Sequence, residues 1–247
     1  MDKNVYEEFF LKEETFWWFK GTRKIIFSLL DNYLNNSRPT ILDIGCGTGI
    51  VAKELEKYGT VYGVDKSRIA VDYCRKRGLD NIIESNAVSL PFEDAAFDLI
   101  LCLDVLEHIS NEADAVSEIL RVLKKDGLVI VNVPAFNLLW SEHDEAVNHC
   151  RRYGMSSIKK LFKKFDFSVL RSSYYNTILF PLIALIRIGK RTIKKFINKN
   201  NTQKTDISNL PGFINNILLA IMNIEKIILK RFTLPFGLSI FLILQKN

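Results

Sequence analysis

The feature that most constrains this chain is a regular alternation of apolar runs with helix-compatible segments between residues 40 and 134. Five runs are nearly continuous in Ile, Leu and Val, and they read TILDIG, TVYGVD, NIIESNA, FDLILCLDV and GLVIVNV. Such runs are typical of strands that are covered on both faces of a parallel sheet. The intervening segments 50–58, 68–77 and 113–123 have the composition of helices. Five successive β-α units predict a doubly wound α/β sheet.

Further elements extend this pattern toward the end of the chain. The segment SSIKKLFKKF predicts an amphipathic helix, FSVLRSSYY a sixth strand and GLSIFLILQ a last strand. We therefore expect an α/β fold with a doubly wound, seven-stranded, mostly parallel sheet of the Rossmann-like type. The expected organisation is an N-terminal helical lid over residues 1–36, a core over 37–176 and 233–247, and a basic amphipathic helical insertion over 177–232.

Composition narrows the classes of function. The four cysteines form no CxxC pair, so they indicate neither a zinc ribbon nor a disulfide framework, and they fit a reducing compartment. The first ten residues lack the basic start and apolar run of a secretory signal, and we expect a cytoplasmic protein. The net charge of +6 is concentrated in residues 187–231, where ten Lys or Arg accompany two acids. Because this segment lacks interleaved base-stacking aromatics, we expect no nucleic-acid partner.

A glycine-rich turn follows the first predicted strand in ILDIGCGTGI, with Gly45, Gly47 and Gly49. Glycines permit a tight turn and let a ligand approach the backbone N–H groups at the start of a helix. The spacing is GxGxG and differs from the GxGxxG of dinucleotide enzymes, because Ile50 occupies the position of the last glycine. Asp65 ends the next strand, where an acid can accept hydrogen bonds from a ribose. The turn therefore predicts a ligand with a ribose and without a pyrophosphate.

With these residues, the region resembles a class I S-adenosylmethionine-dependent methyltransferase. The resemblance rests on LDIGCGTG, GVD, ESNAVSLPFEDAAFDLI, LDVLEHI and LKKDGLVIVNVP. It implies S-adenosylmethionine (SAM) as the cofactor, with Asp43 and the glycine loop at the methionine part, Asp65 at the ribose, and Lys66 beside the adenine. The cofactor residues that the resemblance implies are Asp43, Gly45, Cys46, Gly47, Gly49, Asp65, Lys66, Asn86, Ala87 and Leu103.

The polar stretch WSEHDEAVNHCRRYG at residues 140–154 follows the fifth predicted strand. Open α/β sheets bind ligands at the carboxyl ends of their strands, so this stretch and LDVLEH are expected beside the transferable methyl. Methyl transfer needs alignment and, for a hydroxyl acceptor, a base. The candidate bases are His108, His143 and His149, and a structural polar network is the alternative. Because the six-residue spacing of His143 and His149 matches no familiar zinc pattern, we expect no metal.

Adjacent arginines suggest the charge of the acceptor. Arg151 and Arg152 offer planar forks suited to phosphate or carboxylate, which predicts an anionic acceptor. In the alternative, both arginines pair with nearby acids and only hold the loop. The segment ETFWWFKGTRK is expected to form a lid, unless its Trp pair packs on the sheet. The predicted substrate residues are Asp144, Arg151, Arg152, Tyr153, Trp18 and Arg23.

A second resemblance suggests an acceptor class. WWFKGTRK, HDEAVNHCRRY and PFGLSIFLILQK together are similar to bacterial and archaeal methyltransferases associated with glycosyltransferases, which implies a sugar- or lipid-linked acceptor. In the insertion, basic side chains at helical spacing suit the surface of an anionic membrane, and we expect neither helix to span it. These side chains are Arg187, Lys190, Arg191, Lys194 and Lys195. The alternative is that the apolar helices pack on each other or form a homodimer interface.

These features predict a SAM-dependent methyltransferase that O-methylates an anionic, sugar- or lipid-linked acceptor at the cytoplasmic face of a membrane. The main alternative is a soluble O- or C-methyltransferase of a quinone-like molecule or another metabolite, dimeric through its insertion. A scaffold that binds the cofactor without catalysis is a third interpretation.

Overall fold

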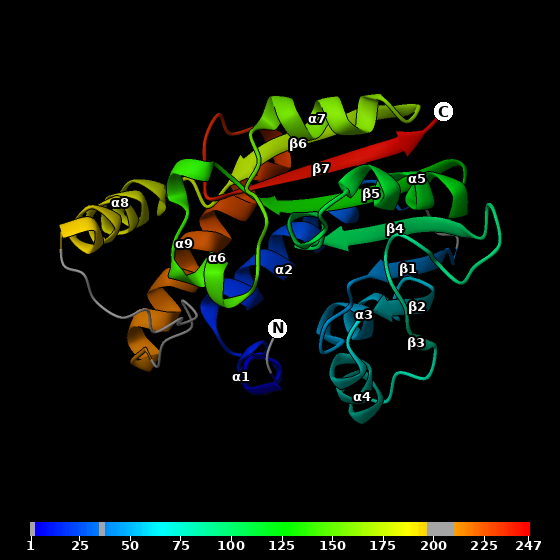
Figure 1. Cartoon of the computed structure of the whole chain (residues 1–247), viewed down its shortest axis with the longest axis horizontal. Helices are drawn as coiled ribbons and strands as arrows, with labels where there is room; N and C mark the ends of the chain where they lie inside the picture. Colours follow the sequence, from blue (N-terminus) through cyan, green and yellow to red (C-terminus); the bar gives the residue numbers. More distant parts are fainter. Residues whose placement is uncertain (1–2, 35–37, 197–209) are drawn as a thin grey trace.

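The computed structural model describes residues 3–34, 38–196 and 210–247, which form one sheet between two layers of helices (Figure 1). The described strands make a seven-stranded sheet in the order β3-β2-β1-β4-β5-β7-β6. β7 is antiparallel to both of its neighbours, β5 and β6, and the other pairs are parallel. The predicted mostly parallel, doubly wound sheet is therefore confirmed. The strands are β1 (Thr40–Ile44), β2 (Thr60–Asp65), β3 (Ile82–Glu84), β4 (Phe97–Leu103), β5 (Leu123–Pro134), β6 (Phe167–Tyr175) and β7 (Ser239–Lys246).

Helices cover both faces of the sheet. α5 and α7 pack on one face, where Ile119 and Phe162 are completely buried against the central strands. α2, α3 and α4 pack on the other face through Leu30, Leu55 and Cys74. The helices are α1 (Lys3–Lys12), α2 (Trp17–Leu30), α3 (Ile50–Leu55), α4 (Arg68–Lys76), η1 (Leu106–His108), α5 (Glu112–Val122), η2 (Asn137–Leu139), α6 (Glu142–Ala146), α7 (Met155–Lys163), α8 (Phe180–Phe196) and α9 (Gly212–Arg231).

The strand order reverses direction at β1, which lies between β2 and β4. Open α/β sheets bind ligands at such a point, outside the carboxyl ends of the strands. Ile44 at the end of β1 is paired with Cys102 near the end of β4. The glycine loop and the LDVLEH segment therefore leave the sheet side by side at one edge.

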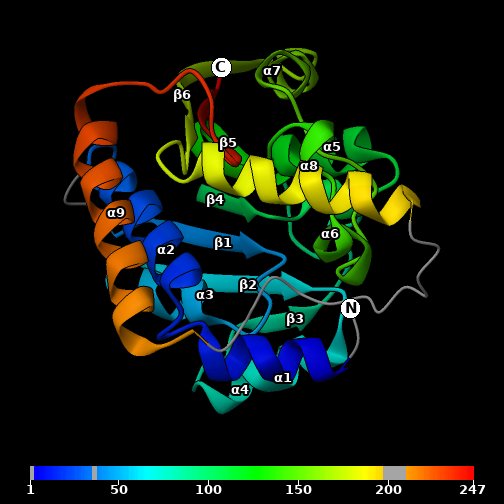
Figure 2. The same ribbon diagram turned by 90° about the vertical axis from the view of Figure 1, so that its left-hand side faces the viewer.

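The N-terminal helices and the insertion pack against each other. Figure 2 shows α9 running alongside α2, and the Met222 Sδ lies 2.2 Å from the place that a Cβ on Gly21 would occupy. The amide of Trp17 donates to Asn215 Oδ1 at 2.8 Å, and the Trp17 ring is buried beside Met222. The two segments form one continuous layer. Residues 197–209 and the side chains of the predicted basic residues Arg191, Lys194 and Lys195 lie outside the described part of the chain.

Among the described helices, α9 is long and apolar enough to cross a membrane when judged by length and composition alone. Only 17% of the apolar window is buried within the chain. One side of α9 packs on α2, and the other side exposes large apolar residues. These residues are Phe213, Ile217, Ile224 and Ile227.

Candidate active site

The glycine loop leaves β1 in a conformation that favours glycine. Gly45, Gly47 and Gly49 have φ angles of 67°, 55° and 87°, in the left-handed region where a side chain is strained. A Cβ on Gly45 would lie 2.4 Å from Val105 Cγ2, so the loop packs tightly against the segment that follows β4. By contrast, no described atom lies within 4 Å of a Cβ placed on Gly47. The loop is thus closed toward the sheet and open at Gly47.

Two acids lie directly under this loop. Asp65 accepts hydrogen bonds from the amides of Gly47 at 3.0 Å and Ser67 at 2.9 Å, which holds the loop and the start of α4. Asp43 is 2% exposed, and its Oδ2 has no hydrogen-bond partner among the described residues. Burial and the nearby charge of Asp65 raise the pKa of Asp43 to about 8. A buried carboxyl oxygen without a donor fits a cation at this place.

These observations fit SAM, whose methionine part carries an ammonium group. Asp43 would hold the ammonium group, the open space at Gly47 would admit the ligand close to the backbone, and Asp65 would accept hydrogen bonds from the ribose. The Asp65 oxygens already accept one amide each, and every carboxylate oxygen can accept a further hydrogen bond.

The residues predicted to flank the adenine lie at the ends of neighbouring strands. Lys66 follows β2 and is exposed, and Asn86 follows β3 and is also exposed. The amide of Ser85 donates to Asp65 O at 3.0 Å, which keeps this turn next to the ribose acid. The Asn86 side chain accepts a hydrogen bond from the Val88 amide at 3.3 Å, so it shapes its own turn. Roles for these residues and for Ala87 in cofactor binding stay predictions.

Two further predicted cofactor residues have mainly structural surroundings. Cys46 is buried, and its Sγ lies 3.8 Å from Cys74 Sγ. Leu103 is half-buried at the last position of β4. Both belong to the apolar cluster under α2, α3 and α4.

The N-terminal segment is latched onto the glycine loop by residues that the sequence patterns did not identify. Thr48 Oγ1 donates to the buried Glu13 Oε1 at 2.5 Å, and the Arg77 guanidinium forms an ion pair with the same carboxylate. Arg77 Nε also donates to Thr48 O at 2.8 Å. Tyr6 on α1 is buried against α4. This latch ties the start of the chain to the cofactor loop, and no local pattern marks it because its members are far apart in sequence.

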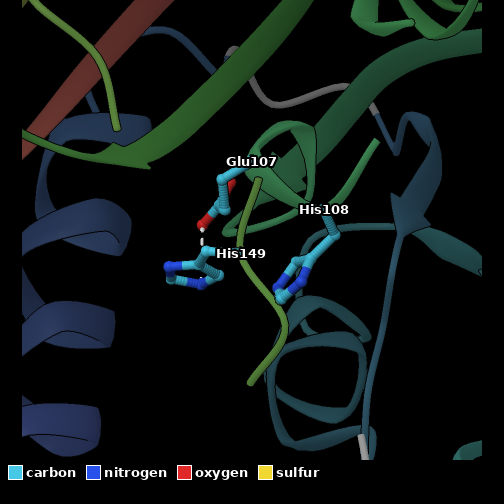
Figure 3. A group of neighbouring side chains, drawn as sticks. All are labelled: Glu107, His108 and His149. Carbon is cyan, nitrogen blue, oxygen red and sulfur yellow. Dashed lines mark ion pairs between the residues drawn. The ribbon is translucent and has the colours of Figure 1, made fainter. Parts of the chain in front are cut away.

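All three histidines of the sequence lie together beyond the ends of β4 and β5. The ring centroids of His108 and His149 are 4.7 Å apart, and those of His143 and His149 are 6.2 Å apart. Figure 3 shows Glu107 pointing its carboxylate toward His149, with His149 Nε2 and Glu107 Oε1 3.8 Å apart. Burial and the neighbouring His149 lower the pKa of His108 to about 4, so its ring is neutral at pH 7.

Asp144 holds the histidine cluster in place through buried hydrogen bonds. The side chain is completely buried and accepts hydrogen bonds from His149 Nδ1 at 2.8 Å and from Arg152 Nε at 2.7 Å. It also accepts from the amide of Ser141 at 2.8 Å, which caps α6. Although burial opposes ionisation, the hydrogen bonds from His149 and Arg152 hold the pKa of Asp144 well below its usual range. Asp144 is therefore a charged carboxylate that orients His149.

The predicted arginine clamp does not form in this structure. Arg152 is 6% exposed and is bound by Asp144 and Ala135 O, whereas Arg151 turns away to Glu112, 2.5 Å from its Nη1. Tyr153 is buried and donates its hydroxyl to the same Glu112, so it does not face an acceptor. The partner Glu112 belongs to α5, far from the arginines in sequence. The alternative that the arginines hold the loop describes this arrangement, and the argument for an anionic acceptor loses its basis.

The predicted lid residues also make internal contacts. Arg23 is 8% exposed and donates to Glu54 Oε1 at 2.9 Å and to Glu13 O at 2.6 Å. Trp18 is half-buried and packs edge-on against Trp17, with ring centroids 5.5 Å apart. The Trp pair packs on the core, and Arg23 helps to hold the latch at Glu13.

Comparison with known proteins finds similarity in the central segment. Residues 42–131 match the family model described as "Methyltransferase domain". The chain is 37% identical over 122 residues to the uncharacterized methyltransferase YcgJ of Bacillus subtilis, a match covering 45% of this chain and 47% of that protein. It is 32% identical over 114 residues to the ubiquinone biosynthesis O-methyltransferase of Rickettsia prowazekii, covering 44% and 45% of the two chains. The chain thus spans about half the length of these curated relatives.

A solved structure supports the fold over a longer stretch. The crystal structure of a putative methyltransferase from Bacillus halodurans C-125 superposes with a TM-score of 0.60 at 20% sequence identity. The superposition covers 90% of this chain and 98% of that one. At this identity the likeness establishes the fold.

The strand order is that of the class I methyltransferase fold. The glycine loop and the two acids beneath it are suited to hold SAM as the cofactor. Within that fold, residues 42–131 match the methyltransferase family model.

Proposed function

We propose that this chain transfers the methyl group of SAM to a hydroxyl oxygen of an acceptor that binds beside Glu107, His108 and His149. The observation that carries the proposal is the convergence of all three histidines and two buried carboxyl groups at the edge of the sheet where the cofactor loop lies. Val105 contacts the loop at Gly45, and η1 with Glu107 and His108 begins at the next residue. The acceptor oxygen and the cofactor would therefore meet at this edge.

His149 is suited to accept the proton of the acceptor hydroxyl. When bound, SAM supplies a methyl group on a positively charged sulfur. A hydroxyl must lose its proton as it attacks such a carbon. Because the charged Asp144 accepts from His149 Nδ1, that nitrogen carries a hydrogen, and in the neutral ring the lone pair lies on Nε2. His149 Nε2 is directed toward the cluster, where it can take the proton.

The surroundings of the site favour an acceptor with an apolar part that is presented at an anionic membrane. α8 contacts η2, which precedes the loop that carries His149, and it exposes Leu182 and Leu185, which are 59% and 73% exposed. α9 exposes a second apolar face. Lys190 and Lys230 are exposed on the same two helices. Apolar faces with basic residues beside them bind anionic lipid surfaces. A lipid-linked sugar is the acceptor class that the sequence suggested and that fits these faces.

A second candidate is methylation of a quinone-like small molecule, with the exposed faces joined in a homodimer. This candidate is favoured by similarity to several ubiquinone biosynthesis O-methyltransferases, among them those of Rickettsia prowazekii and Alkalilimnicola ehrlichii. Vesicle binding separates the two candidates, because only the first requires a lipid surface.

The reaction is tested with SAM carrying a labelled methyl group and a lipid extract or a set of phenolic acceptors. We expect label in an ether product from the wild-type chain, and His149→Ala to lower turnover at least tenfold while SAM binding persists. Label on nitrogen or carbon, or full turnover in His149→Ala, would contradict the proposal.

The membrane part is tested by flotation with anionic and zwitterionic vesicles. We expect the chain to float with anionic vesicles, and the double variant Leu182→Asp, Leu185→Asp to stay in the dense fraction. Leu11→Asp is the matched control, since Leu11 is 68% exposed but lies on α1. Equal flotation of all three proteins, or flotation of none, contradicts membrane docking through α8.

A further inference from the structure

We infer that Glu107, His108 and His149 bind a divalent transition-metal ion at the acceptor edge of the site. One ligand atom from each residue lies within 4.8 Å of the other two. Tetrahedral ligand atoms that bind one ion at about 2.0–2.2 Å lie about 3.3–3.6 Å apart, so rotation of these side chains by shifts of up to about 1.5 Å at the ligand atoms would close the set. Figure 3 shows that the three side chains converge from η1 and from the loop after α6.

The state of Glu107 points independently to a cation. The side chain is completely buried, and neither carboxyl oxygen has a hydrogen-bond partner within the described part of the chain. A buried carboxyl group without hydrogen-bond partners lowers the free energy of unfolding, because its desolvation is not offset. A metal ion at the cluster would satisfy the Glu107 oxygens that no described protein donor reaches.

The histidines are held as metal-binding histidines usually are. Asp144 binds His149 Nδ1 at 2.8 Å and is itself fixed by Arg152, while the carbonyl of Asn148 lies 3.4 Å from His108 Nδ1. Hydrogen bonds at Nδ1 fix the ring orientation and leave Nε2 as the ligand atom, as in carboxylate–histidine–metal arrangements. The charged network around Asp144 would then orient His149 as a metal ligand in addition to holding the loop.

The donor set selects the kind of ion. Two imidazoles and one carboxylate favour Zn²⁺, Co²⁺, Mn²⁺ or Fe²⁺, whereas Mg²⁺ and Ca²⁺ prefer oxygen ligands. Three protein ligands leave coordination positions for water or for an acceptor hydroxyl. The sequence predicted no metal because only the His143 and His149 spacing was considered, and the actual partner of His149 is His108 on another segment.

The role of the ion rests on the proposed function. A hydroxyl bound to the ion ionises at lower pH, with its proton passing to solvent. The new oxygen–carbon bond forms as the sulfur–carbon bond of SAM breaks, and the electron pair of that bond stays on sulfur. His149 would then serve as a ligand of the ion instead of the proton acceptor. Methylation of a hydroxyl by a protein that binds no metal would show that His149 takes the proton itself.

The site is tested by titrating the metal-free full-length protein with Co²⁺ and recording its visible absorption, followed by competition with Zn²⁺. We expect one equivalent to bind with d–d bands of nitrogen and oxygen ligands. Glu107→Gln, His108→Ala and His149→Ala should each weaken Co²⁺ binding about tenfold to a hundredfold. His143→Ala is the matched control, a neighbouring histidine outside the ligand set, and should change the affinity less than twofold.

Each variant is also titrated with S-adenosylhomocysteine, which reports whether the cofactor site is folded. Asp144→Asn should weaken Co²⁺ binding about tenfold without removing any ligand atom. Absence of Co²⁺ binding by a wild-type protein that binds S-adenosylhomocysteine overturns the metal site, as does equal loss in His143→Ala. Metal binding without methylation of any hydroxyl would leave the site intact and refute the proposed reaction, so the two failures are distinguishable.

Discussion

We expect the affinity for the cofactor to rise with pH, because the buried Asp43 must ionise when the cofactor binds. The pKa of Asp43 is raised to about 8 by burial and by Asp65, so about 90% of the carboxyl groups are protonated at pH 7 in the free protein. A cationic ammonium beside Oδ2 favours the carboxylate. Binding must therefore release about 0.9 proton per site at pH 7, and affinity must rise about tenfold from pH 6 to pH 7.

The assay is isothermal titration with S-adenosylhomocysteine at pH 7 in two buffers of different ionisation enthalpy. The difference in observed heat gives the number of protons released, and a pH series gives the slope of affinity. Above about pH 8 the slope should flatten, because Asp43 is then already ionised in the free protein. Asp43→Asn supplies the control, since it keeps the size of the side chain and removes the titration. Proton release that is near zero in the wild type, or unchanged in Asp43→Asn, would refute this reasoning.

Two stability predictions follow from the loop and its latch. Arg77→Met leaves the buried Glu13 without its ion partner, so it should lower the free energy of unfolding, measured in urea, by about 3 kcal/mol or more. The control Arg75→Met changes a side chain that is 50% exposed and should alter that free energy by less than about 0.5 kcal/mol. Similar losses in both variants would contradict the latch. Gly45→Ala should lower the free energy of unfolding by about 1–3 kcal/mol more than Gly47→Ala. Both glycines have positive φ, but only a Cβ at position 45 would meet another side chain. Equal melting temperatures of the two variants would contradict this prediction.

Most of the sheet could be predicted because its information is local. Each parallel strand is a short run of Ile, Leu and Val followed by a helical pattern, and parallel connections of this kind have few possible arrangements. The sequence of β7 alone does not determine which strands it pairs with. GLSIFLILQ is apolar on both faces wherever it is inserted, and only packing places it antiparallel between β5 and β6. The contact of α9 with α2 was equally non-local.

Some residues of the candidate site could likewise be predicted from local sequence, and others could not. The glycine loop and Asp65 could be predicted because strand, turn and acid are adjacent in sequence and have one common use. The arginine clamp was wrong as a geometric expectation because Glu112 and Asp144 neutralise Arg151 and Arg152 after folding. The sequence predicted only that His108 and His149 lie at the same edge of the sheet, and the grouping of both rings with Glu107 depends on how the loops fold.

Binding of SAM by the glycine loop can be measured by equilibrium titration of the purified protein with SAM. We expect one site per chain. The affinity should fall about tenfold to a hundredfold in Asp65→Ala, because hydrogen bonds to a charged group are lost. It should be unchanged in Asp80→Ala, because Asp80 is an exposed acid outside the loop. No binding by a folded wild-type protein, or equal affinity in Asp65→Ala, would contradict binding at the glycine loop.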